Sequence, residues 1–136
     1  MSRPVHGDTP DLDQADFERL LSFRDGLRRF LRWSEDQAKS VGLTASQHQL
    51  LLAIQGHAGT PSVGDVAEHL LLRHHSVVEQ IDRAERAGLV TRSADPDDHR
   101  VVRIALTAKG RSKLSSLAAT HLQELSRLAG ELPSLR

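Results

Sequence analysis

The stretch that decides the fold is residues 63–110, VGDVAEHLLLRHHSVVEQIDRAERAGLVTRSADPDDHRVVRIALTAKG. Apolar residues recur at i, i+3, i+4 and i+7 from Val63, which predicts a short amphipathic helix opened by Gly64 and Asp65. After a turn at residues 71–73, a second helix is expected to end at Gly88, which suits the left-handed C-cap position. Two helices across a tight turn have the outline of a helix-turn-helix.

The hydrophobic period changes from helical to alternating after Gly88. Residues 89–93 are predicted to form one strand. A second is predicted at residues 101–106, where Val102, Ile104 and Leu106, facing inward, alternate with Val101, Arg103 and Ala105. The polar turn cluster ADPDDHR lies between them at residues 94–100. We therefore expect a hairpin with an apolar face that covers the preceding helices. Its tip would carry Asp97, Asp98, His99 and Arg100.

Longer helices flank this unit on both sides. Residues 13–41 carry a wide apolar stripe, and a further helix begins at a capping box formed by Thr44 and Gln47 and stops near Gly56. Thr107 is suited to cap a last helix with an apolar stripe that continues until Pro133. Both outer helices outrun the small core of residues 44–106, which favours packing against a second copy of the chain. A single wide core face is the alternative.

The composition excludes several classes of protein. The 136 residues include 18 basic and 18 acidic side chains and no cysteine, which rules out disulfides, thiolate metal sites and thiol redox sensing. No apolar run approaches the roughly 18 residues that span a bilayer, and the beginning, MSRPVHGDTPDLD, lacks the apolar core of a secretion signal. We therefore expect a soluble, cytoplasmic protein without a membrane partner.

Charge is also balanced within residues 73–103. Any nucleic-acid binding must therefore depend on a few placed groups rather than on bulk charge. The balance is between six arginines (Arg73, Arg83, Arg86, Arg92, Arg100 and Arg103) and six carboxylates (Glu79, Asp82, Glu85, Asp95, Asp97 and Asp98).

Four segments together resemble the winged helix of the multiple antibiotic resistance regulator (MarR) family in order and spacing: VGDVAEHL, IDRAERAGLV, DPDDHR and IALTAKG. With the flanking helices, LTASQHQLLLAI included, the resemblance covers residues 13 to 132. It implies a mainly α fold with a small β-hairpin wing, which is a winged helix-turn-helix with long N- and C-terminal dimerisation helices. The implied segments are a flexible lead-in (1–12), an N-terminal dimerisation helix (13–43), a DNA-binding region (44–107) and a C-terminal dimerisation helix (108–136).

The resemblance implies a transcription regulator, usually a repressor, that binds a pseudo-palindromic DNA operator as a homodimer and is released by a small phenolic or anionic effector. The recognition helix would present Arg73, His74, His75, Ser76, Glu79 and Gln80 to the major groove, and exclusion agrees, because Val77 and Ile81 are needed for the core. The wing would bind DNA through His99, Arg100 and Arg103, with Asp98 supporting Arg100 or Arg86. An effector pocket would be lined by Phe30, Trp33, Gln37, His48 and Leu51, although Trp33 also suits simple packing in the dimer core.

Family members usually have Ser or Thr as the N-cap of the recognition helix, where this chain has Arg73, so His74 or the turn backbone is an alternative cap. Each polar residue of this helix also suits an ordinary solvated surface.

Other functions find less support in the residues. The histidine spacing shows no metal-binding pair on one helical face, and no phosphate loop or nucleophile motif occurs, so we expect no metal, no cofactor and no enzyme activity. One alternative is a winged-helix protein-interaction module without specific DNA binding. A narrower one is pH or metal gating of DNA binding through His74, His75 and His99.

Overall fold

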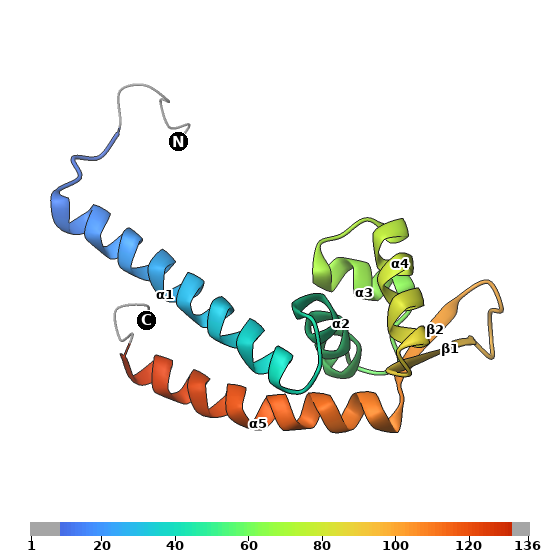
Figure 1. The fold of residues 1–136 in the computed structure, drawn as a ribbon. Helices are drawn as coiled ribbons and strands as arrows, with labels where there is room; N and C mark the ends of the chain where they lie inside the picture. The colour runs from blue at the N-terminus through green and yellow to red at the C-terminus, as the bar shows by residue number, and fades with distance from the viewer. Residues whose placement is uncertain (1–8, 132–136) are drawn as a thin grey trace. The chain divides into compact units, whose positions relative to one another are not determined.

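The computed structural model describes residues 9–131, which form five helices and one β-hairpin (Figure 1). They fall into two compact units that divide between Trp33 and Ser34, inside the first helix. Among the described residues, no helix is both long enough and apolar enough to cross a membrane. The elements are α1 (Gln14–Ser40), α2 (Ala45–Gly56), α3 (Val63–Leu70), α4 (His74–Arg86), β1 (Val90–Ala94), β2 (Val102–Leu106) and α5 (Ala108–Glu131).

The predicted mainly helical winged fold is confirmed. The core of the second unit forms around α2, which contacts α3, α4, α5 and β2. Leu132 and Pro133, where the last stripe and helix were predicted to end, lie outside the described residues, as does most of the predicted lead-in. The buried core residues are Ala38, Leu43, Leu50, Leu51, Ile54, Val63, Val66, Val77, Ile81, Ala84, Leu89, Val90, Ile104, Leu106, Leu114 and Leu117.

The predicted helix-turn-helix is also confirmed. Helices α3 and α4 are joined by residues 71–73, and Leu71 closes α3 in the left-handed conformation at φ 55°. The backbone N–H of Leu72 donates to the carbonyl of Ala67 at 3.1 Å, which ends the helix in a tight turn. Gly88 ends α4 with φ 76°, as expected for a glycine C-cap.

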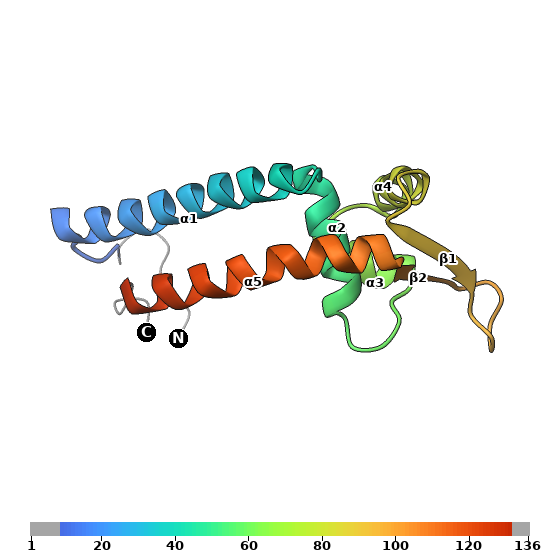
Figure 2. The same cartoon turned by 60° about the horizontal axis from the view of Figure 1, so that its bottom comes forward.

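The first strand of the hairpin begins one residue later than predicted. Strand β1 begins at Val90, and Leu89 lies in the core instead. The antiparallel register runs from Val90 opposite Leu106 to Ala94 opposite Val102. Val102 was predicted to face inward with Ile104 and Leu106, but it is exposed, because the end of the hairpin extends beyond the helices (Figures 1 and 2).

Side chains cap the starts of four of the five described helices, and α4 is the exception. Thr44 and Gln47 form the predicted capping box of α2, and Ser62 and Asp65 form a second one at α3, where we had expected Gly64 to open the helix. Thr107 accepts the N–H of Gly110 at the start of α5, as predicted. At α1, Asp13 and Asp16 bond reciprocally to each other's backbone N–H. Helix α4 has no side-chain cap, since Arg73 occupies its N-cap.

The first turn of α5 packs against the residue that precedes β1. Gly110 is buried, and a Cβ atom built there would lie 2.2 Å from the carbonyl oxygen of Leu89. That carbonyl already accepts the N–H of Thr107 at 2.9 Å, so it cannot move away freely. Glycine is therefore required by close backbone approach and not by a positive φ.

We expect Gly110→Ala to lower the free energy of unfolding by about 1–3 kcal/mol, because overpacking forces the backbone to shift. Chemical denaturation of both proteins measures the difference. Gly64→Ala is the matched control: a Cβ at this exposed helical glycine would meet only the Ser62 hydroxyl, at 3.7 Å. Equal stability of Gly110→Ala and the wild-type chain would contradict the packing described here.

Candidate nucleic-acid interface

Helix α4 presents a buried face and a polar face. Val77, Ile81 and Ala84 are completely buried, and Val78 packs against the core beside them. His74, His75 and Glu79 are exposed, and Ser76 and Gln80 are half-buried. His75 and Glu79 therefore lie opposite the face that packs into the core, and the other predicted groove-facing residues lie at the start of α4 or at the edge of that face.

The start of α4 lacks a side-chain acceptor for its free N–H groups. Arg73 is the N-cap of α4, so the structure defines the helix start that the sequence left undecided. The Arg73 side chain makes no capping hydrogen bond. The first turn carries no acidic residue. A helix start of this kind leaves backbone donors and the positive end of the helix dipole available to an anion such as a phosphate.

The tip of the hairpin is organised by two carboxylates. Asp95 accepts the backbone N–H groups of Asp97 at 3.0 Å and Asp98 at 2.9 Å, which fixes the turn. Asp98 then binds Arg100 in a fork, with Nε donating to Oδ1 at 3.0 Å and Nη2 to Oδ2 at 3.1 Å. This pair lowers the pKa of Asp98 and raises that of Arg100. Of the two arginines that the sequence offered as partners, Asp98 holds Arg100.

Arg100 nevertheless remains accessible, because its side chain is 91% exposed. Three of its donors are oriented by Asp98, whose Oδ1 also accepts the Arg100 backbone N–H at 3.1 Å. His99, next to it, is also exposed. The tip therefore presents an oriented guanidinium to the solvent.

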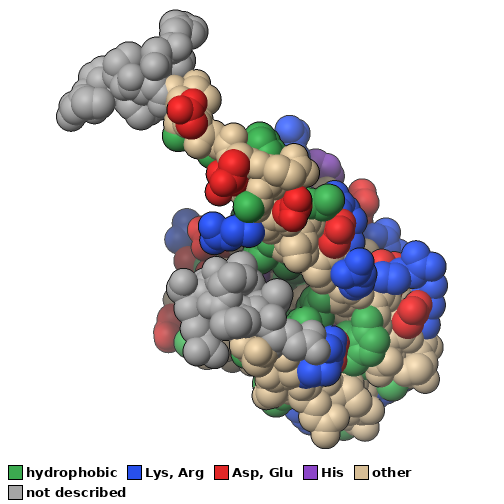
Figure 3. Space-filling view, turned by 90° about the vertical axis from the view of Figure 1, so that its left-hand side faces the viewer, with side chains coloured by type: hydrophobic (Ala, Val, Ile, Leu, Met, Phe, Trp, Pro, Cys, Tyr) green, Lys and Arg blue, Asp and Glu red, His purple; other side chains and the backbone are tan. Residues whose placement is uncertain are grey.

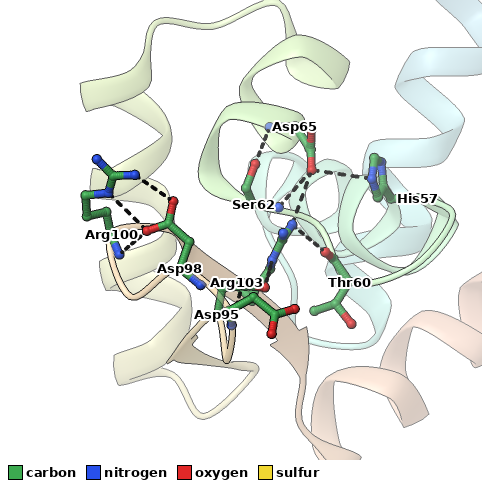
Figure 4. A network of polar contacts seen from close by, with 9 residues as sticks. His57, Thr60, Ser62, Asp65, Asp95, Asp98, Arg100 and Arg103 are labelled. Atoms are coloured by element: carbon green, nitrogen blue, oxygen red, sulfur yellow. Dashed lines mark hydrogen bonds and ion pairs between the residues drawn. The ribbon is translucent and has the colours of Figure 1, made fainter.

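Arg103 lies in a different environment from Arg100. Its Nε donates to Asp95 at 3.0 Å and its Nη1 to the carbonyl of Thr60 at 3.2 Å, with Asp65 Oδ2 at 4.0 Å (Figure 4). Only 32% of its side chain is exposed. The predicted phosphate contact of Arg103 stays a prediction, but its guanidinium is already engaged within the chain.

A second arginine joins the hairpin to α4. Arg92 Nη1 lies 2.8 Å from Asp82, and its Nη2 lies 2.7 Å from Glu85. The hydrogen bond to Glu85 is the main cause that raises the pKa of Arg92. Sequence reasoning missed Arg92, Asp95 and Asp65 as organising residues, and the exposed position of Arg92 on an alternating strand was the one available signal.

Two histidines meet beside the same network. His57 Nδ1 lies 3.0 Å from His69 Nε2, and His57 Nε2 lies 3.5 Å from Asp65. The hydrogen bond from the Ser62 backbone N–H is the main cause that lowers the pKa of Asp65. Within residues 9–131, no group of three histidine or acidic side chains is arranged to hold a metal ion. His74, His75 and His99, the residues considered for pH or metal gating, are not part of this cluster.

The residues expected to line an effector pocket lie in both compact units. In the first, the rings of Phe30 and Trp33 are 5.9 Å apart. In the second, Gln37 is half-buried, His48 is 8% exposed, and Leu51 is completely buried in the core. A depression of about 430 Å³ on α2 and α3 contains none of these five residues. The effector pocket therefore stays a prediction.

His48 packs against a second histidine that links two helices. Its ring lies edge-on to that of His121, with centroids 4.9 Å apart. His121 Nδ1 lies 2.8 Å from the carbonyl of Leu117, which can only accept, so Nδ1 carries the proton. Nε2 of the same ring lies 2.7 Å from the hydroxyl oxygen of Ser34. Burial and, secondly, the charge of His121 lower the pKa of His48.

Comparisons with known proteins agree with this geometry. The model of the MarR family matches residues 41–101, from the start of the core to the wing. The HTH-type transcriptional repressor MdtR of Bacillus subtilis is 30% identical over 84 residues, which are 62% of this chain and 54% of that repressor. Residues 41–101 of this chain are thus similar to the MarR family. The matched part spans only about half the length of MdtR.

Solved structures of MarR-type regulators share the fold. AbsC, a MarR family transcriptional regulator from Streptomyces coelicolor, has a TM-score of 0.72 at 20% identity, covering 93% of this chain and 95% of AbsC. The transcriptional repressor CouR, bound to a 23-mer DNA duplex, has a TM-score of 0.69 at 23% identity, covering 92% of this chain and 89% of CouR. At these identities the likeness establishes the fold alone.

We expect the stability of this protein to fall as the pH drops from 7 to 5. His48 takes up a proton near its ordinary pKa of 6.5 when unfolded, whereas its folded pKa is lower. The stability that neutral His48 contributes is therefore complete above pH 6.5 and is lost as the pH falls from there toward the folded pKa. Thermal unfolding at both pH values measures the loss, which His48→Gln should reduce. His99→Gln, in the exposed wing, is the control, and an unchanged pH dependence in His48→Gln would refute the assignment.

Proposed function

We propose that this chain is a sequence-specific DNA-binding transcription regulator that represses transcription as a homodimer on a pseudo-palindromic operator. The observation that carries the proposal is the pairing of an exposed polar face on α4 with an exposed, oriented Arg100 on the adjoining hairpin. A recognition helix and a wing of this kind suit the major groove and an adjacent minor groove. The repressor MdtR and the DNA-bound CouR support the same role.

The recognition helix supplies both base and phosphate contacts in this proposal. His75 and Glu79 are four residues apart and exposed, so they share one face of α4. The backbone N–H groups that follow Arg73 in the first turn have no capping side chain and are suited to bind a phosphate. Arg73, Arg83 and Arg86 are exposed and make no ion pair within the described residues, which leaves positive charge beside this face.

Exposed apolar side chains on the outer helices support the homodimer. Leu20 on α1 and Leu122 on α5 are each 63% exposed. Hydrophobic side chains also reach the surface among acidic and basic ones in the space-filling view (Figure 3). Exposed apolar side chains in such numbers on each helix mark an interface, and a two-fold dimer would match a palindromic operator. The exposed residues are Phe17, Leu20, Leu21, Phe23, Leu27 and Leu31 on α1, and Leu122 and Leu125 on α5.

Release by a small phenolic or anionic effector is part of the proposal. Within the first unit, the aromatic pair Phe30 and Trp33 offers the kind of apolar surface that such a ligand needs. Binding of salicylate, followed by tryptophan fluorescence, tests this part directly, because Trp33 is the one tryptophan of the sequence.

Two observations favour a second function. The chain has no net charge, and Glu79 on the exposed face of α4 would repel a phosphate. A winged-helix module that binds another protein would tolerate both features. A weak response to any DNA that varies little with salt, together with a stable protein complex, would favour this alternative.

We expect selection from randomised duplexes to enrich one palindromic sequence, to which the chain binds. Arg100→Ala should then weaken binding to all sequences by about tenfold, the loss of one oriented contact, whereas His75→Ala should change the base preference. Fluorescence anisotropy measures both. Arg28→Ala is the control, since Arg28 pairs with Asp25 on α1, outside the recognition surface. The absence of any sequence preference after selection would refute the proposal.

We expect the chain to sediment as a dimer and Leu20→Glu to dissociate it, because a buried, unpaired carboxylate is costly at an apolar interface. Leu52→Glu provides a matched control: Leu52 is an exposed leucine on α2, 55% accessible, in the DNA-binding region. Analytical ultracentrifugation at micromolar concentration compares the three proteins. A monomeric wild-type chain, or a Leu20→Glu variant that remains dimeric, would contradict this interface.

A further inference from the structure

Arg103 connects three segments that are far apart in the sequence. Its guanidinium contacts Asp95 at the end of β1, the carbonyl of Thr60 in the loop after α2, and Asp65 in the first turn of α3 (Figure 4). The backbone follows the same path, since Ser62 forms an isolated β-bridge with Arg103. Arg103 therefore fastens the outer half of the hairpin to the helix-turn-helix.

The anchor on the helical side is itself fixed. Asp65 accepts the backbone N–H of Ser62 at 2.9 Å and donates its own N–H to the Ser62 hydroxyl at 3.1 Å, so its carboxylate is part of a capping box. His57 Nε2 approaches the same oxygen at 3.5 Å. An arginine bound to this carboxylate is held in place relative to α3.

The contacts continue from Arg103 to the exposed tip. Asp95 receives Arg103 on Oδ1 and holds the backbone of Asp97 and Asp98 through Oδ2. Asp98 in turn holds Arg100 in its fork. A continuous series of hydrogen bonds and ion pairs thus runs from α3 to Arg100.

The hairpin depends on such an anchor because it has only two strands. A two-stranded hairpin has marginal stability by itself, and the burial of this one is confined to Val90, Ile104 and Leu106. Thr91 to Ala94 are all exposed, so packing does not fix the outer half. The side-chain contacts of Arg103 restrain it from the side of α3, together with the Ser62 β-bridge and the hydrogen bond from the Ile104 N–H to the Pro61 carbonyl.

We propose that Arg103 and Asp95 are positioning residues, which hold the hairpin so that Arg100 and α4 engage DNA together. This inference rests on the proposed DNA-binding function. Arg103 acts through the hairpin and not through a phosphate of its own, because its charge faces Asp95 and Asp65 and its side chain is largely covered. Arg100, by contrast, is almost fully exposed.

A double-mutant cycle on the selected operator tests this role. Arg103→Met keeps the length of the side chain and removes the guanidinium, and it should weaken binding about as much as Arg100→Ala does. The double variant should be no more than about twofold weaker than either single variant, since both changes remove the same contact. Arg28→Met, which removes a paired arginine on α1, should bind like the wild-type chain.

Salt dependence separates positioning from direct contact. If Arg103 bound a phosphate itself, the losses of affinity caused by the two substitutions would multiply. The slope of the logarithm of the binding constant against the logarithm of the salt concentration would then be shallower by about one further unit in the double variant. That result, or wild-type binding by Arg103→Met, would overturn the inference while leaving the proposed function intact.

Hydrogen exchange of the DNA-free protein supplies an independent measurement. The amides of Asp97 and Asp98 should exchange faster in Arg103→Met, because Asp95 loses its partner, and should be unchanged in Arg100→Ala. Unchanged exchange in Arg103→Met would overturn the inference. If the wild-type chain showed no sequence preference, the proposed function would fail, and with it the role in DNA binding, whereas the exchange rates would still report whether Arg103 orders the hairpin.

Discussion

The burial of one face of α4 is the constraint on which the other features depend. Val77, Ile81 and Ala84 are completely buried, and they fill the space beside α2 and α3. Because a helix repeats every 3.6 residues, the burial of these three side chains directs His75 and Glu79 toward the solvent. The same core receives Val90 and Ile104 from the hairpin. The position of the polar face and the root of the wing are thus fixed by the same apolar contacts.

The balanced charge of this region has a structural explanation. Four of its six carboxylates are engaged with arginines: Asp82 and Glu85 with Arg92, Asp95 with Arg103, and Asp98 with Arg100. Three other arginines, on or beside α4, have no ion pair within the described residues. A count of charges therefore understates how positive the surface at α4 is, since most of the acidic groups serve to orient basic ones. Local geometry, and not net charge, decides what such a surface can bind.

Periodicity and capping patterns predicted the order and type of every described element, because these signals are local. The capping box at Thr44, the left-handed Gly88 and the turn at residues 71–73 each depend on a few neighbouring residues. The contacts of Arg103 could not be found in this way, because its partners Thr60 and Asp65 lie about forty residues earlier in the chain. The inward orientation of Val102 failed for a related reason: alternation assigns a face but not where the core beneath that face ends.

The local departures from good helix design are concentrated in the turn between α3 and α4. Leu71 adopts a left-handed conformation that costs a non-glycine residue roughly 1–2 kcal/mol, and its side chain is 90% exposed. Three residues later α4 begins without the side-chain cap that each of the other described helices has, an omission that costs about 1 kcal/mol. Sequences that fold well keep such conflicts for functional positions. Their location at the start of α4 is what a surface that binds phosphate through free backbone N–H groups requires, because a capping side chain would occupy the same donors.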